Sequence, residues 1–500
     1  MIKKHSVAIL SVLLAAMFAI SLLSSCATPG GTDSKTDEVS GAAGSSADIT
    51  TASLYDDEGY LLDDLPADLK FGDTLSILRW EDVEHPEFDV EEQTGDLILD
   101  QLFSRNQTVE SRLGLTIEWH AIKGNGDNRS NWNNHLINKA KSGDADYDVL
   151  ASYSLSIAMN ASSGLLTDML DTSTCPYLNF SQPWWSDLLV EQATILGKLY
   201  FASGDISRNA LEMMYVCFVN NELLSKFNLE NPQKYVETGD WTYDKFIEMC
   251  QGVYEGAGTK DADADTFGYM CSGIHNDPWF YGSGATICEK DENGYIVASE
   301  SMFSERVVDT LDKMIGLFGS QYGIYTDSVK HQKAFRDNRI LFCTDRCRCS
   351  HKVFAENADC KYVVVPCPKY NKDQDRFYTV MGNPFTLYAI AANCEDKAKA
   401  SAFVECMASE GYRKVTPAVF ELSLKTKYVD DPTSGEMYDI IRESLTYDLG
   451  RIFSNDLIGQ GDFRSAISVA SNSWMTRKVG IEKRLNTLTK NLMQSFESLG

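Results

Sequence analysis

The chain has 500 residues, of which 72 are acidic and 45 are basic, so its formal net charge is −27. This length exceeds what a single hydrophobic core usually supports, and we expect two domains. The apolar fraction of 43% argues against a disordered chain, and the negative charge argues against nucleic acid as a partner, because binding phosphates requires a basic surface.

The first residues have the pattern of an export signal, which we assign to residues 1–25. Lys3 and Lys4 precede an uncharged, mainly apolar run from Ser6 to Leu23, and the run leads into Cys26. This pattern resembles the bacterial lipoprotein signal, which implies cleavage before Cys26 and attachment of acyl chains to it. An uncleaved membrane helix is the alternative. Both interpretations place the rest of the chain on the extracytoplasmic face of the cell membrane.

Residues 26–69 are predicted to form a flexible linker between the lipid anchor and the folded part. The stretch from Ala27 to Ser53 is rich in Gly, Ser, Thr, Ala and Asp, and it has no aromatic residue. This composition is typical of a flexible tether.

Strand and helix patterns alternate after residue 70. Strands are predicted at Thr74–Trp80, Leu115–His120 and Tyr147–Ser152, with helical patterns over 96–113 and 131–143 between them. This order predicts a parallel sheet, in which ligands bind beyond the carboxyl ends of the strands. The residues expected at those ends are Trp80, Glu81, Asp82, Ser152, Tyr153 and Ser154.

The stretch from Gly197 to Leu224 begins like a strand, bends at Gly204 and Asp205, and continues into a second apolar region. Further elements follow in chain order. They are a helix with Thr242 as its N-cap, a helix from Ser304, strands at 339–345 and 361–368, an extended run over 377–392, a helix at 397–409, and mostly helix after Gly411.

The motifs of metal and nucleotide chemistry are missing from the sequence. The seven histidines show no HExxH spacing, and there is no GxSxG or GxxxxGK[ST] motif. The acidic run from Asp261 to Gly268 lacks the Gly and Glu of a calcium loop. Cys343, Cys347 and Cys349 lack the paired CxxC spacing of structural zinc sites. We therefore predict no cofactor and no metal.

Twelve cysteines follow Cys26, and an even number in an exported chain is compatible with a disulfide framework. Most of them, such as Cys217, Cys250 and Cys406, lie within apolar patterns typical of buried free thiols. The pairing stays open at this point.

Aromatic residues at strand ends and in loops indicate a binding surface for sugars. An aromatic ring packs against the apolar face of a sugar while neighbouring polar groups bind its hydroxyls. Ordinary core packing is the alternative. The rings concerned are Trp80, Tyr153, Trp184, Trp185, Trp279 and Tyr281.

The order of these segments resembles the bacterial extracellular solute-binding proteins of family 1, which are maltose-binding-protein-like lipoprotein receptors of carbohydrate ABC importers. The resemblance covers residues 70–500. It rests on the lipoprotein signal and on the segments SGDADYDVLAS, GKLYFASGDISRNALEMMYVCFVNNELL, GDWTYDKFIEMC, LFCTDR and VVVPCPKYN, taken in this order.

The resemblance implies an α/β, two-lobed periplasmic-binding-protein-like fold (class II), with a cleft between lobes joined by hinge segments. The first lobe would comprise residues 70–205 plus 375–411, and the second 206–374 plus 412–500. Closure of the lobes around a carbohydrate would present the protein to ABC permease subunits. A monomer without enzymatic activity is implied.

By position, the resemblance also implies a set of ligand-binding residues and no catalytic ones. These are Trp80, Glu81, Asp82, Ser152, Tyr153, Asp205, Arg208, Asn209, Trp279, Tyr281, Asp345, Arg346 and Asn383. Two alternatives remain. Strand-end carboxylates such as Asp205 also suit a cell-surface glycosidase or lyase, and a closed lobe pair also suits a ligand sensor for a receptor kinase.

Overall fold

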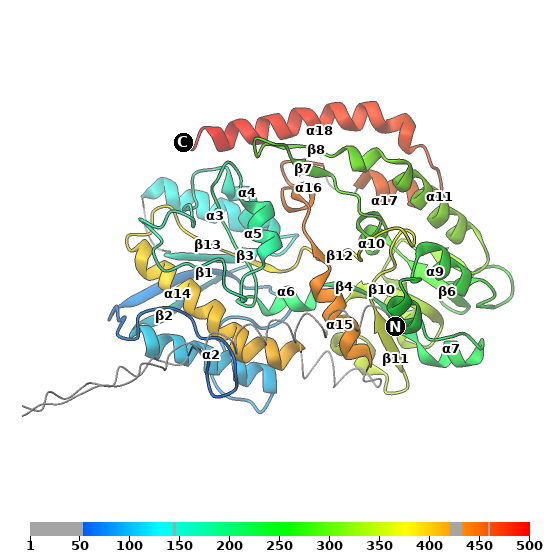
Figure 1. Ribbon diagram of the computed structural model, residues 1–500, viewed down its shortest axis with the longest axis horizontal. Helices are drawn as coiled ribbons and strands as arrows, with labels where there is room; N and C mark the ends of the chain where they lie inside the picture. Colours follow the sequence, from blue (N-terminus) through cyan, green and yellow to red (C-terminus); the bar gives the residue numbers. More distant parts are fainter. Residues whose placement is uncertain (1–53, 144–146, 421–432, 459–460) are drawn as a thin grey trace, which may run out of the picture. The chain divides into compact units, whose positions relative to one another are not determined.

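The computed structural model describes residues 54–143, 147–420, 433–458 and 461–500 (Figure 1). The predicted signal peptide, Cys26 and the linker up to Ser53 lie outside the described residues. Every helix among the described residues is too short or too polar to traverse a lipid bilayer.

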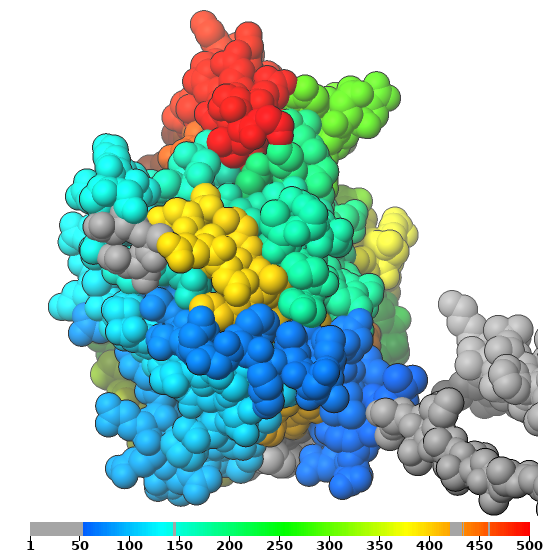
Figure 2. Space-filling model, turned by 90° about the vertical axis from the view of Figure 1, so that its left-hand side faces the viewer, coloured from blue at the N-terminus to red at the C-terminus, as the bar shows by residue number. Residues whose placement is uncertain are grey.

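The first lobe is built on a four-stranded sheet of order β13-β3-β1-β2. Its strands are β1 (Thr74–Trp80), β2 (Thr116–Ile122), β3 (Val149–Tyr153) and β13 (Thr386–Ile390). Strand β1 pairs in parallel with both β2 and β3, as the sequence pattern predicts, and β13 pairs antiparallel with β3. In Figure 2 the returning chain (yellow) accordingly lies among residues of the first third of the sequence (blue and cyan).

Helices flank this sheet because their apolar faces need cover. Helix α2 begins where Asp96 accepts hydrogen bonds from the first backbone N–H groups, and it ends at Gly114, whose φ of 62° closes the last turn. It packs against α14. The helices of this lobe are α2 (Leu97–Leu113), α3 (Arg129–Ser142), α4 (Ser154–Ala161), α5 (Asp187–Ala193) and α14 (Lys397–Glu410).

Part of the predicted linker belongs to the first lobe. Leu65 is buried in the core, and Asp63 accepts hydrogen bonds from Arg112 of α2 and from Ser409 of α14. These contacts attach the chain to two helices of the lobe. The structure therefore corrects the predicted linker of residues 26–69, because its last residues are packed.

The second lobe is built on a six-stranded mixed sheet of order β11-β4-β10-β6-β5, with β9 paired to β6. Every residue of β4 and β10 is buried, which explains their nearly continuous apolar sequences. The strands are β4 (Tyr215–Asn220), β5 (Tyr254–Glu255), β6 (Thr266–Cys271), β9 (Gly323–Tyr325), β10 (Ile340–Arg346) and β11 (Tyr362–Val365).

The remaining elements cover this sheet or connect the lobes. Thr242 caps α9 by accepting from the backbone N–H of Lys245, as predicted. The helices are α6 (Arg208–Glu212), α7 (Asn221–Lys226), α8 (Gln233–Thr238), α9 (Tyr243–Cys250), α10 (Asp277–Gly282), α11 (Glu305–Gly319), α12 (Lys330–Arg336), α13 (Cys349–Lys352), α15 (Thr433–Glu443), α16 (Leu449–Ile452), α17 (Gly461–Ser468) and α18 (Trp474–Glu497). Two short strand pairs are β7 (Cys288–Lys290) with β8 (Ile296–Ala298), and β12 (Thr379–Val380) with β14 (Leu445–Thr446).

The first passage from lobe to lobe leads through Gly204 and Asp205 into α6 and β4. The strand predicted before this bend does not form, because the segment makes only isolated bridges. Lys198 pairs with Ile195, Ala202 with Tyr388 of β13, and Gly204 with Trp185. A Cβ atom on Gly204 would lie 2.1 Å from the carbonyl oxygen of Trp184. Glycine is therefore required here by close backbone packing.

All twelve cysteines after Cys26 are buried, and none forms a disulfide in the described ranges. This agrees with the interpretation of the cysteine pattern as buried free thiols.

Candidate functional site

Polar side chains from both lobes meet where the strands of the two sheets end. Tyr153 is the last residue of β3, Arg346 is the last residue of β10, and Tyr215 is the Cα partner of Arg346 at the start of β4. Asn383 lies between β12 and β13, and its side chain hydrogen-bonds Tyr153. Arg451 of α16 completes this group, which we call the polar cluster.

The electrostatics of the polar cluster favour neutral phenols beside fixed positive charge. Burial raises the pKa of Tyr153, and the positive charges of Arg451 and Arg346 only partly oppose this effect. Burial likewise raises the pKa of Tyr215. Both phenols keep their protons at neutral pH and can therefore donate hydrogen bonds; in this structure the hydroxyl of Tyr215 donates to the carbonyl oxygen of Ile274 at 3.4 Å.

A buried ion network fixes Arg451. Asp277, at the start of α10, is 0% exposed and accepts from Nη1 of Arg451 at 2.6 Å and from Nε of Arg464 at 2.6 Å. Burial acts to raise the pKa of Asp277, but the two guanidinium groups outweigh burial and lower the pKa. The carboxylate is therefore ionised and holds Arg451 beside Tyr153.

The two lobes contact each other around the polar cluster. Oε2 of Glu84 lies 2.7 Å from Nη1 of Arg348, and Nδ2 of Asn455 donates to the carbonyl oxygen of Leu155 at 3.0 Å. Such direct contacts between lobes are typical of a closed arrangement.

The other predicted residues at the strand ends of the first lobe differ in burial and in hydrogen bonding. Trp80 is 0% exposed and donates from Nε1 to Oγ1 of Thr386, while its ring lies 5.8 Å from that of Tyr153. Ser152 is buried, and Glu81 is exposed to solvent. Trp80 therefore supports the ring of Tyr153 from inside the lobe.

Asp82 organises a loop. Its carboxylate accepts from the backbone N–H groups of Gly124 and Asn125 at 2.7 and 2.9 Å, and from Nδ2 of Asn128 at 2.9 Å. These bonds satisfy the carboxylate within the first lobe.

Three predicted residues lie along the first passage between the lobes. Asp205 accepts from Oγ1 of Thr416 at 2.9 Å and from Nη2 of Arg442 of α15 at 3.0 Å, which links the first passage to the chain after α14. Arg208 pairs with Glu212, and Asn209 donates to Glu87 at 2.6 Å. Their side chains hold the junction together, and none of these bonds reaches the polar cluster.

Trp279 and Tyr281 correct the sequence analysis. They lie in helix α10, and each is only 1% exposed. Nε1 of Trp279 donates to the hydroxyl of Tyr269, and the hydroxyl of Tyr281 donates to Asp448. Both rings pack inside the second lobe. They are therefore core residues and do not lie at the cleft as predicted.

Trp184 and Trp185 also have fixed partners. Their indole N–H groups donate to the two carboxylate oxygens of Glu405, at 2.9 and 3.0 Å. The two residues line a cavity of about 210 Å³ beside the passages, together with Asp205 and Arg442.

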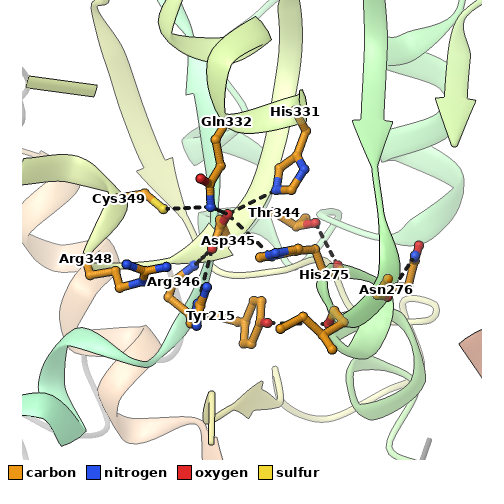
Figure 3. Close-up of polar contacts among 12 residues, drawn as sticks. Tyr215, His275, Asn276, His331, Gln332, Thr344, Asp345, Arg346, Arg348 and Cys349 are labelled. Carbon is orange, nitrogen blue, oxygen red and sulfur yellow. Dashed lines mark hydrogen bonds and ion pairs between the residues drawn. The ribbon is translucent and has the colours of Figure 1, made fainter. Parts of the chain in front are cut away.

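Asp345 is fully buried and lies beside two histidines (Figure 3). Its Oδ2 is 3.0 Å from Nε2 of His331 and 3.4 Å from Nδ1 of His275, and it accepts from Gln332 at 2.7 Å. Neither histidine could be predicted as part of a site, because the two are far apart in the chain and share no motif.

The chain was compared with protein families, curated proteins and solved structures. No protein-family model and no curated protein matches the chain. A cyclo/maltodextrin-binding protein complexed with maltotetraose is similar in structure, with a TM-score of 0.53 and 12% identity over 84% of this chain and 96% of that one. An ABC substrate-binding protein from Listeria monocytogenes, in complex with cycloalternan, has a TM-score of 0.50 and 13% identity over 85% of this chain and 100% of that one.

The chain has the two-lobed α/β fold of solute-binding proteins. The expected fold class is therefore confirmed. In this fold, Tyr153 and Arg346 end strands of separate lobes, and ligands bind beyond such ends, which makes the polar cluster the candidate site. Of the predicted residues, the structure brings Tyr153, Arg346 and Asn383 together there.

Two members of the polar cluster were not predicted. Arg451 lies in a four-residue helix late in the chain, where the sequence pattern gives no sign of a site. Tyr215 begins a buried strand, and an aromatic residue in that position is typical of ordinary core.

Proposed function

We propose that this protein binds a carbohydrate outside the cytoplasm and delivers it to an ABC importer. The polar cluster carries the proposal, because Tyr153 and Asn383 approach it from the first lobe and its return segment, whereas Tyr215, Arg346 and Arg451 belong to the second lobe. A solute that bonds to both sets would hold the lobes closed, and a permease recognises that state.

The chemistry of the polar cluster suits sugar hydroxyls. Phenol and guanidinium groups donate hydrogen bonds, the amide of Asn383 both donates and accepts, and the tyrosine rings offer apolar faces. The cycloalternan and maltotetraose in the two compared structures support carbohydrate as the ligand class.

The export pattern supports the proposed location. We place the mature chain on the extracytoplasmic face of the cell membrane, held there by acyl chains on Cys26. The protein would act as a monomer and without catalysis, handing an unchanged ligand to the permease. Mass spectrometry of the amino-terminal peptide from membranes tests the anchor: the acylated Cys26 peptide is expected, and an unmodified peptide with an intact leader would contradict it.

Isothermal titration calorimetry of the mature chain against mono- and oligosaccharides tests the ligand class. Tyr153→Phe keeps the ring but removes the hydroxyl, so we expect affinity to fall by roughly 3- to 10-fold, the value of one hydrogen bond. Tyr295→Phe is the matched control, since Tyr295 donates to Glu497 on the surface of the second lobe. If no carbohydrate binds, the ligand assignment is wrong.

The same samples separate binding from catalysis. After prolonged incubation with the protein, a bound oligosaccharide should be recovered unchanged by chromatography. New reducing ends or unsaturated products, absent from a heat-inactivated sample, would show that the protein is a glycosidase or lyase.

A further inference from the structure

Three side chains that the proposed function leaves unused converge inside the second lobe: His275, His331 and Asp345 (Figure 3). Oδ2 of Asp345 lies 3.0 Å from Nε2 of His331 and 3.4 Å from Nδ1 of His275. All three atoms lie within 4.8 Å of one another. Each residue is at most 2% exposed, so the group is shielded from bulk water.

Regular elements hold the three residues. His275 lies in the 3-10 turn Gly273–Asn276 directly after β6, Asp345 lies at the end of β10, and β6 and β10 are parallel neighbours. His331 lies in α12, which packs on β10. Two strands of the sheet and one helix packed on it therefore hold the three residues in place.

We propose that His275, His331 and Asp345 bind a divalent transition metal ion. Two imidazole nitrogens and one carboxylate oxygen form a donor set that zinc and other late first-row metals accept. Donor atoms about 2.0–2.1 Å from a tetrahedral ion lie roughly 3.3 Å from one another. The observed distances of 3.0 and 3.4 Å already approach that value.

The long contact between Nδ1 of His275 and the carboxylate of Asp345 also supports the proposal. Nδ1 of His275 is buried and has no hydrogen-bond partner among the described residues, although it lies beside the carboxylate. A buried imidazole nitrogen without a partner is costly. A metal ion between Nδ1 and Oδ2 would satisfy it.

The outer contacts of the site are those expected around a metal ligand. Nε2 of Gln332 donates to Oδ2 of Asp345 at 2.7 Å, and the backbone N–H of Arg346 donates to Oδ1 at 2.7 Å. Such bonds orient a ligating carboxylate. Because Arg346 belongs to the polar cluster, the ion would also fix the end of β10 that carries it.

A second histidine group is a weaker candidate. His85 lies 2.8 Å from Glu212 through Nε2 but faces His351, at 3.5 Å, through Nδ1. Arg208 also places a positive charge 3.1 Å from the carboxylate of Glu212. This group is explained as an ion-pair network between the lobes.

Cobalt(II) titration of chelator-treated mature protein tests the site, because Co²⁺ bound by nitrogen and oxygen in a tetrahedral site absorbs visible light. We expect saturation at one equivalent in the wild-type protein and loss of this absorption in His331→Gln and His275→Asn. Both amides still donate a hydrogen bond to Asp345 while removing the imidazole ligand. Circular dichroism checks that the variants are folded.

Two histidine variants serve as controls. His120→Gln removes an exposed imidazole, and His351→Gln disrupts the second group, so both should bind cobalt like the wild-type protein. Absence of binding in the wild-type protein, unchanged binding in His331→Gln and His275→Asn, or loss in His351→Gln would each overturn the proposal.

X-ray absorption keeps the proposal testable if the ligand variants fail to fold. The spectrum of the metal-loaded wild-type protein should show two imidazoles and an oxygen shell. A shell of oxygen alone, or one dominated by sulfur, would overturn it.

Discussion

Glu84 and Arg348 form an ion pair between the two lobes, with Oε2 of Glu84 2.7 Å from Nη1 of Arg348. Glu84 follows β1 in the first lobe, and Arg348 follows β10 in the second. Their side chains are 25% and 13% exposed, so water weakens this pair less than it weakens a surface pair. The pair therefore holds the segments after β1 and β10 together.

Glu84→Gln should shift the lobes toward an open state. We expect ligand affinity to fall by about 1 kcal/mol, and the radius of gyration of the ligand-free protein to rise in small-angle scattering. The double variant with Arg348→Gln should bind no more weakly than Glu84→Gln alone, because Glu84→Gln already removes the pair with Arg348 together with the longer contact to Arg346 at 3.9 Å. Glu356→Gln is the control, since its pair with Arg336 lies within the second lobe. Additive losses would contradict the assignment.

Close packing, and not backbone flexibility, accounts for Gly204. Its Cβ position lies 2.1 Å from the carbonyl oxygen of Trp184, which also accepts from the backbone N–H of Asp205 at 2.8 Å. Gly204→Ala should lower the free energy of unfolding by about 1–3 kcal/mol in urea titrations, the usual cost of overpacking.

Gly480→Ala is the matched control for Gly204→Ala. Gly480 lies inside α18, with no heavy atom of the described chain within 4 Å of its Cβ position beyond its own neighbours and helix backbone. Alanine there should raise the free energy of unfolding by roughly 0.5–1 kcal/mol. Equal effects of the two substitutions would show that the backbone near Trp184 shifts at little cost and that close packing does not require glycine at position 204.

The regular elements were the part of this fold most open to prediction. The predicted strand Thr74–Trp80 has the observed bounds. The spacing of its β-branched and apolar residues fits a strand and not a helix. Tyr153 and Arg346 could be named as candidates from the sequence because a strand end is a local feature of it. Residues beyond such ends were harder to place, since Asp82 caps a loop while Tyr153 enters the polar cluster, and only packing decides between these roles.

Tertiary contacts explain the errors. Trp279 and Tyr281 lie between Pro and Gly in a one-turn helix, where turn residues and rings look like an exposed loop. The pairing of His275 with Asp345 depends on the parallel register of β6 and β10, which no local pattern reveals.

The buried carboxyl of Glu405 should make the stability of the protein depend on pH. Burial raises the pKa of its carboxyl to about 7 from 4.5, although the backbone N–H of Asn179 and the indoles of Trp185 and Trp184 all donate to it. Between these two pH values the folded state holds a proton that the unfolded state has lost. The free energy of unfolding therefore falls as pH rises from about 4.5 to 7, by at most about 3 kcal/mol.

Urea titrations across this pH range measure the effect. Glu405→Gln cannot titrate at this position. The free energy of unfolding of the wild-type protein should therefore fall relative to that of this variant as pH rises. Glu118→Gln, at an exposed position, should leave the pH profile of the wild-type protein unchanged. Parallel profiles for the wild-type protein and Glu405→Gln would mean that the carboxyl is already ionised well below neutral pH.

Asp277→Asn should be the most destabilising of these substitutions. It keeps the shape of the side chain but removes a negative charge to which the guanidinium groups of Arg451 and Arg464 both donate at 2.6–2.7 Å. Breaking a buried ion pair costs about 3–5 kcal/mol. Asp462→Asn, which breaks the partly exposed pair with Arg484, should cost less than about 1 kcal/mol.

The pH dependence of this network has the opposite sign to that of Glu405. The folded-state pKa of Asp277 lies below 3.8, so its contribution is present above that pH and disappears as the carboxylate protonates on further acidification. Urea midpoints measured from neutral pH down to acid should therefore converge for the wild-type protein and Asp277→Asn. A constant gap at all pH values would show that the loss comes from packing and not from the charge.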